Sequence, residues 1–281
     1  MIRAVLAAVA AAGAGGIAAG AARTAYTALK RYPPGGSHVW SRTNHRGEPV
    51  TLLEGPAAAA GAVAAALAAP GPGSVRTRAA LALAGAGGAA FGVYDDLAGS
   101  GKRRGLRGHL GALAQGEVTT GAVKLGGIGG TGLASAVLAG AQPADVVINA
   151  GLIAGGANLL NLFDLRPGRA IKVATASAVM IAASGRKGRQ AVAAPLGAGL
   201  ALLPDDLGEH AMLGDGGANA LGAMLGAAAA TSLPRGARLA LLTGIVALTA
   251  ASEKISFTKV IEDTPPLRWL DMLGRRPPLR R

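Results

Sequence analysis

The sequence contains no cysteine, and aromatic residues make up only 3% of its 281 residues. Without cysteine the chain can form neither disulfides nor thiolate metal sites, and thiol catalysis is excluded. Four histidines offer little for a zinc cluster. The shortage of aromatic rings argues against a surface that stacks nucleic-acid bases, so we expect no nucleic-acid partner. Charged residues amount to 15%, where a soluble domain carries roughly 25%.

The chain is instead rich in alanine, glycine and aliphatic residues: 51% of it is hydrophobic, and it has 45 glycines. Its nearly uncharged stretches approach the roughly 20 residues that cross a bilayer. Small residues let helix backbones approach closely inside a membrane. We therefore predict an all-α, polytopic membrane helix bundle of about nine transmembrane helices. The predicted spans are 4–22, 51–69, 79–94, 125–142, 144–162, 170–184, 190–204, 217–233 and 237–252.

The basic residues predict how this bundle is oriented. The net charge is +13, and 20 of the 28 lysines and arginines lie in the segments 23–50, 95–124, 163–172 and 253–281. Loops rich in Lys and Arg face the cytoplasm. We thus expect a multi-pass protein of the cell (inner) membrane whose acidic clusters face the cytoplasm. Residues 1–252 would form the transmembrane bundle with its cytoplasmic active-site loops.

Residues 253–281 would form a basic cytoplasmic tail. Leu267–Leu273 is predicted as a short interfacial helix within it. The basic end, Arg275–Arg281, is expected to be solvated and to face the lipid.

A first polar cluster, Asp95-Asp96, ends the apolar stretch 79–94. Two carboxylates at a helix end are often only solvated, which is one interpretation here. The helix dipole disfavours negative charge at a carboxyl end. A cation nearby, either Mg²⁺ or one of Lys102, Arg103 and Arg104, would relieve that repulsion.

A second cluster is Asn158, Asn161 and Asp164, which recur at every third position at the end of another span. This spacing projects the three side chains onto neighbouring faces of the last helical turns. The amides could simply bond a neighbouring helix. The carboxylate beside them makes a ligand-binding face the alternative.

A third cluster is the glycine-rich turn Gly214-Asp215-Gly216-Gly217, which opens the span 217–233. Glycines allow a ligand to approach the backbone, and a helix amino terminus favours a phosphate. Asp215 could hold a cation against that phosphate, or it could only cap the helix. Carboxylates from separate spans that meet at one membrane face would suit Mg²⁺, which takes a few carboxylates together with waters and substrate phosphates.

Two loops carry further polar residues. The acidic pairs Asp205-Asp206 and Glu209-His210 precede Asp215, and they either extend the acidic site or belong to a solvated loop. The stretch Arg42–Gly47 could touch an anionic substrate or lipid headgroups.

The order of these motifs resembles the polyprenyl-phosphate N-acetylhexosamine-1-phosphate transferases, which include the phospho-MurNAc-pentapeptide translocase and the GlcNAc-1-phosphate transferases. The resemblance covers about Thr43–Phe257. The family's Asp-Asp motif is similar to Asp95-Asp96, and its Asn-x-x-Asn-x-x-Asp motif is similar to the second cluster. Its Gly-Asp-x-Gly-Ser/Ala motif matches Gly214, Asp215, Gly217 and Ala218.

The resemblance implies an Mg²⁺-dependent enzyme of cell-envelope glycan synthesis, such as that of peptidoglycan. It would move a sugar 1-phosphate from a UDP-sugar to a polyprenyl phosphate and release UMP, and it is compatible with a homodimer. The implied catalytic residues are Asp95, Asp96 and Asp164. The implied metal ligands are Asp215 and Asp95, and the implied substrate-binding residues are Asn158, Asn161, Lys102, Gly214 and Gly217.

The chain departs from the family pattern at several places, one of them His109-Leu110, which replaces a Lys-Leu of the family. The second aspartate that the family associates with the nucleotide base is replaced by Pro167, and the region 253–268 lacks the histidines of the family's late loop. These departures favour an alternative hypothesis, a non-catalytic relative that binds lipid-linked intermediates or acts as a scaffold for envelope enzymes. A small transporter ranks third, because no charged residue lies clearly in the middle of a span.

Overall fold

The computed structural model describes residues 2–68, 74–99, 108, 111–112 and 115–277, and it is mostly helical, as predicted. The helices are α1 (Ile2–Arg31), α2 (Ser37–Trp40), α3 (Glu54–Ala68), α4 (Val75–Ala98), α6 (Thr120–Leu138), α7 (Pro143–Phe163), α8 (Arg169–Ala183), α9 (Arg186–Leu207), α10 (Gly214–Ser232), α11 (Arg235–Ser252), α12 (Phe257–Asp263) and α13 (Pro265–Met272). Two short strands, β1 (Ser41–Thr43) and β2 (Pro49–Thr51), form an antiparallel hairpin.

Each of the nine predicted spans lies mostly within one of the long helices. By length and apolar composition, however, only α6 and α7 among the described helices qualify singly as membrane spans. The pair α11 and α12, which is bent by 94°, would qualify as a third span if the two helices are taken together. Helices rich in alanine and glycine are only weakly hydropathic, so the number of nine spans stays a prediction.

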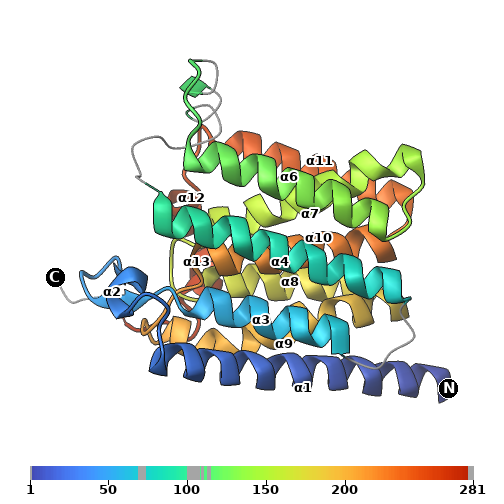
Figure 1. Ribbon diagram of the computed structural model, residues 1–281, viewed down its shortest axis with the longest axis horizontal. Coiled ribbons are helices and arrows are strands. Elements are labelled where there is room, and N and C mark those ends of the chain that lie inside the picture. The colour runs from blue at the N-terminus through green and yellow to red at the C-terminus, as the bar shows by residue number, and fades with distance from the viewer. Residues whose placement is uncertain (1, 69–73, 100–107, 109–110, 113–114, 278–281) are drawn as a thin grey trace.

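The long helices lie side by side with their axes in similar directions (Figure 1). The N-terminus lies at one end of the bundle, whereas α2, α12 and α13 gather at the other end. At that second end Thr51 of the hairpin pairs with Ala211, in the turn before α10. This end, called the loop end below, also holds the end of α4 and the start of α10.

Helix α10 forms the centre of the bundle. Its residues from Gly216 to Ala230 are all buried, and it packs against α3, α4, α7 and α9. Glycines let α4 come unusually close to it. A Cβ atom at Gly92 would lie 2.3 Å from the carbonyl oxygen of Asp215, and one at Gly88 would lie 2.7 Å from that of Asn219. The α4 backbone therefore rests directly on the α10 backbone, which brings the end of α4 to the start of α10.

The C-terminal segment folds back onto the loop end instead of extending into solvent. The Arg169 guanidinium at the start of α8 donates two hydrogen bonds to the buried Asp271 carboxylate of α13, at 2.6 and 3.1 Å. Arg275 pairs with the same carboxylate, and Arg276 pairs with Glu48 of the hairpin turn. The expectation that 275–281 is solvated was therefore wrong for Arg275, whose side chain is 8% exposed beside the buried Asp271. The side chain of Arg276 stays 40% exposed in its pair with Glu48.

The predicted helix at Leu267–Leu273 corresponds to α13, which covers Pro265–Met272. Its Trp269 and Leu270 are exposed, while Asp271 points inward. An apolar outer face on a helix whose polar residue is held inward is typical of a segment at a membrane surface.

The opposite end of the bundle carries its own ion pairs. Asp145, at the start of α7, pairs with Arg238 at 2.8 Å and with Arg235 at 3.1 Å. Arg238 also donates a hydrogen bond to Asn149. These two arginines of α11 compensate the charge of Asp145.

We predict that Gly92→Ala destabilises the protein by about 1–3 kcal/mol, because the added methyl group would force α4 away from α10. The measurement is thermal unfolding in detergent. Gly129→Ala in α6 is the control, since a Cβ atom there meets nothing within 4 Å. An unchanged melting temperature for Gly92→Ala would contradict the close helix contact.

We predict that Asp271→Asn loosens the C-terminal segment, because it leaves the buried Arg169 without a counter-charge. Burial tends to raise the pKa of Asp271, but the hydrogen bond from Arg169 and the charges of Arg169 and Arg275 hold that pKa below its ordinary value of 3.8. The stabilisation is thus present above pH 3.8 and lost as the pH falls below it. Limited trypsin digestion should cleave the variant's tail on the order of tenfold faster at pH 7. The exposed Asp263→Asn should leave the cleavage rate as it is.

Candidate active site at the loop end

Side chains from three helices meet at the loop end around the ammonium group of Lys124. Its Nζ atom lies 2.6 Å from Oδ2 of Asp95, at the end of α4. The same atom donates a hydrogen bond to Oδ2 of Asp215, in the first turn of α10. All three side chains are largely buried, with exposed fractions of 16 to 26%. Two of the predicted site residues are therefore brought together on one cation.

Asp96 has a different role from its neighbour. Its carboxylate oxygens accept hydrogen bonds from the backbone N–H groups of Asp215, at 3.0 Å, and Gly216, at 2.9 Å. It thereby caps the amino terminus of α10 from outside the helix. The N–H groups that the sequence suggested for a phosphate are thus already bonded to Asp96.

The predicted glycines shape the turn before α10. Gly214 has a φ of +60°, which L side chains rarely adopt, and a Cβ atom there would lie 2.8 Å from Leu52. A Cβ atom at Gly217 would lie 2.6 Å from the Cα atom of Gly55, so this glycine lets α3 pack against α10. Both glycines position the backbone that carries Asp215.

Asp164, the residue that ends α7, lies between this cluster and a cavity. Its carboxylate accepts a hydrogen bond from the N–H group of Gly214, the neighbour of Asp215. Burial, together with the charges of Asp206, Asp215 and Asp96, raises its pKa well above the ordinary value. A raised pKa favours the neutral form of this carboxyl group over its charged form.

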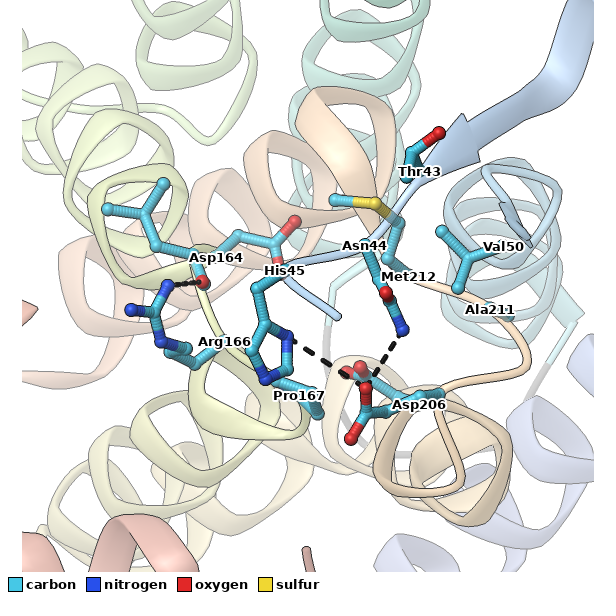
Figure 2. A pocket seen from close by; sticks show the side chains of 12 residues that line it. Thr43, Asn44, His45, Val50, Asp164, Arg166, Pro167, Asp206, Ala211 and Met212 are labelled. Carbon is cyan, nitrogen blue, oxygen red and sulfur yellow. Dashed lines mark hydrogen bonds and ion pairs between the residues drawn. The ribbon is translucent and has the colours of Figure 1, made fainter. Parts of the chain in front are cut away.

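The cavity has a volume of about 200 Å³ and opens among the hairpin, the turn after α7 and the loop before α10 (Figure 2). It is lined by Thr43, Asn44, His45, Val50, Asp164, Leu165, Arg166, Pro167, Asp206, Glu209, Ala211 and Met212. Pro167, which stands where the family has an aspartate, is part of this wall.

Glu209 ties the hairpin to the cavity. It accepts hydrogen bonds from Arg46 at 2.8 Å and from Asn44 at 2.9 Å, and His45 lies 3.8 Å away. Glu209 itself has a φ of +59°, a strained conformation for a residue other than glycine. Arg46 further donates hydrogen bonds to the carbonyl oxygens of residues 276 and 277, so the C-terminal segment and the cavity share this arginine.

One member of each acidic pair before α10 is buried, while His210 is exposed. Asp206 and Glu209 are 2% and 4% exposed. The alternative that they extend the acidic site is therefore the better interpretation, because both line the cavity beside Asp164.

The structure does not bring the other predicted residues into the cavity wall. Asn158 donates a hydrogen bond to Thr249 of α11 at 3.3 Å, which agrees with the interpretation that it bonds a neighbouring helix. Asn161 lies in the last turn of α7, apart from the cavity lining. Lys102 lies outside the described residues.

Lys124 is the site residue that the sequence interpretation missed. In that interpretation it is only one of the basic residues of 95–124 that predict how the bundle is oriented in the membrane. A lysine one turn inside a long apolar helix is itself a signal, since a charge there needs a partner.

Asp95 and Asp215 fit a magnesium ion. In the described part of the chain, no three histidine, aspartate or glutamate side chains are close enough to hold a metal by themselves. Mg²⁺, however, commonly binds one or two carboxylates, several waters and the phosphates of a substrate. The oxygens of Asp95 and Asp215 already converge on one cation, Lys124, and would supply the protein ligands.

Comparisons with known proteins do not identify the chain. No protein-family model matches it, and no curated protein matches it significantly. The candidate site therefore rests on the residues and their geometry.

We predict that Lys124→Met makes the folding stability depend on Mg²⁺. Without the ammonium group Asp95 and Asp215 repel each other, and a divalent ion between them would relieve that repulsion. The variant should melt lower than the wild type in EDTA and recover on addition of Mg²⁺. The control is Lys187→Met at an exposed position, whose melting temperature should not respond to Mg²⁺. If the melting temperature of Lys124→Met also failed to respond to Mg²⁺, the result would argue against a cation site.

Proposed function

We propose that this protein is a membrane-embedded transferase that moves a sugar 1-phosphate from a UDP-sugar to a polyprenyl phosphate in cell-envelope glycan synthesis. The observation that carries the proposal is the meeting of Asp95, Asp215 and Lys124, from three helices, at one end of the bundle. The motif resemblance supplies the reaction class. It is supported by the cavity beside Asp164, which offers room next to the charged cluster.

The proposal includes a multi-pass arrangement of about nine spans in the inner membrane, with the loop end in the cytoplasm. Its support is the agreement between the nine apolar ranges and the long helices, together with the excess of lysine and arginine in the loop-end segments. Soluble nucleotide sugars are made in the cytoplasm and the acceptor lipid lies in the membrane. A site at the cytoplasmic end of the helices would be open to both.

In the proposed reaction a phosphate oxygen of the polyprenyl phosphate attacks the phosphorus that bears the sugar. The bond from that phosphorus to the bridging oxygen breaks, and UMP leaves with the electron pair. The acceptor phosphate is already ionised at neutral pH, so the step needs no general base. The protein must then hold two anionic groups close together, because phosphoryl transfer depends mainly on positioning and neutralisation of charge.

The site residues divide this work. The ammonium group of Lys124 neutralises phosphate oxygens, while Asp95 and Asp215 would hold the magnesium ion. Bound there, Mg²⁺ would withdraw charge from the phosphates. Asp96 keeps the start of α10 in place through its two backbone hydrogen bonds. Asp164 would lie beside the path of the phosphates, and burial and the neighbouring carboxylates raise its pKa.

A protein that binds these substrates without turnover is the second candidate. Lys124 already compensates both Asp95 and Asp215, and the described tail up to residue 277 brings no histidine to the site. Such a protein would still bind the lipid phosphate or the nucleotide.

The test incubates purified full-length protein in detergent with polyprenyl phosphate, Mg²⁺ and a panel of UDP-sugars, and measures UMP release. We predict release with at least one donor, a requirement for Mg²⁺, and a loss of at least 100-fold in Asp215→Asn, which removes a metal ligand. Asp145→Asn, at the other end of the bundle, should retain activity. Absence of release from every donor, with substrate binding intact, would favour the second candidate.

A further inference from the structure

The cavity at the loop end suits a small flat ring. Its walls are largely apolar and come from Val50, Leu165, Pro167, Ala211 and Met212. Buried carboxylates, including that of Asp206, lie among these walls (Figure 2). Apolar walls with a few fixed polar groups are typical of sites that bind small organic molecules.

Asp206 has an oxygen that needs a hydrogen-bond donor. The residue is 2% exposed, and its carboxylate accepts a hydrogen bond from the N–H group of Gly168. Its other oxygen, Oδ2, is buried and has no partner among the described residues. A buried acceptor without a donor costs free energy, so such an atom is often completed by a ligand or a water.

The other two carboxylates that line the cavity already have hydrogen-bond donors. Glu209 is bonded by Arg46 and Asn44, and Asp164 accepts from Gly214. Among the described side chains that line the cavity, Oδ2 of Asp206 is the buried polar atom left without a partner. A ligand in the cavity is therefore expected to present an N–H group to this oxygen.

The cavity is also correctly placed for one end of a nucleotide. Asp164 forms part of its wall and bonds Gly214, whose neighbour Asp215 contacts Lys124. A nucleotide whose base occupies the cavity would thus extend its phosphates past Asp164 towards the lysine.

We propose that the cavity binds the uracil base of the donor nucleotide and that Oδ2 of Asp206 accepts the N3–H group of that base. Asp206 of α9 would then recognise the base. Pro167 cannot do so, because its side chain has no hydrogen-bond acceptor. The proposal rests on the proposed function in one respect, because that function makes the donor a uridine nucleotide. It adds a base-reading residue from another helix.

The first experiment changes the ligand and leaves the protein intact. Binding of UMP, N3-methyl-UMP and 5-methyl-UMP to the full-length protein in detergent with Mg²⁺ is measured by calorimetry. Methylation at N3 removes the hydrogen that Asp206 would accept and should weaken binding by about tenfold or more. Methylation at C5 keeps that hydrogen and should have a much smaller effect. Equal affinity for UMP and N3-methyl-UMP would overturn the proposal, whether or not any variant folds.

The second experiment distinguishes loss of the hydrogen bond to Asp206 from a steric clash of the N3-methyl group with the cavity wall. In Asp206→Ala the affinity for UMP should fall by about tenfold, and the added penalty for N3-methylation should disappear, since the two changes remove the same interaction. Asp205→Ala is the matched control, because Asp205 pairs with Arg23 and does not line the cavity. It should keep both the UMP affinity and the N3-methyl penalty.

The outcomes distinguish this proposal from the proposed function. If Asp206→Ala binds UMP as the wild type does while UMP release from a UDP-sugar persists, the base-reading role is wrong and the transferase stands. If the N3-methyl penalty is the same in both proteins, Asp206 is not the acceptor. If the wild type binds no uridine nucleotide and releases no UMP, both proposals fail.

Discussion

The direct contact between the backbones of α4 and α10 is the constraint on which the site depends. Gly88 and Gly92 leave no room for a side chain between the two helices. Only at this separation can the carboxylate of Asp96 reach two N–H groups at the start of α10. The same contact sets Asp95 beside Asp215, so helix packing and the chemistry of the site have one origin.

The second constraint is electrostatic. Removal of carboxylates from water is costly unless each has a partner. At the loop end Lys124, Arg46 and Arg169 supply that compensation for Asp95 and Asp215, for Glu209 and for Asp271 respectively. Asp206 keeps one buried oxygen unpartnered. Glu54 at the start of α3 is also fully buried, and both of its oxygens lack a partner among the described residues. Buried carboxylates without partners are typical of functional sites.

Much of the fold could be predicted from apolar stretches and their spacing, because a long run of Ala, Gly, Leu and Val in this composition forms a helix. The shared end of the three motifs followed from their positions at span boundaries. In the structure Lys124 joins Asp95 to Asp215, and the backbone from Gly214 to Gly216 donates hydrogen bonds to Asp96 and Asp164. Lys124 escaped notice because its partners lie 29 and 91 positions away in the sequence. The docking of the tail on Arg169 was missed for the same reason, since a pattern along the chain does not show which distant charge a basic residue meets.

The central claim is that carboxylates and a lysine from separate helices form one phosphate site, with a base cavity beside it. A cryo-EM map of the full-length protein with UMP and Mg²⁺ tests this claim most directly. We predict nucleotide density with its phosphate next to Lys124, a magnesium ion held by Asp95 and Asp215, and the base between Pro167 and Asp206. A map in which the nucleotide binds elsewhere, or in which these two carboxylates do not share a cation, would contradict it.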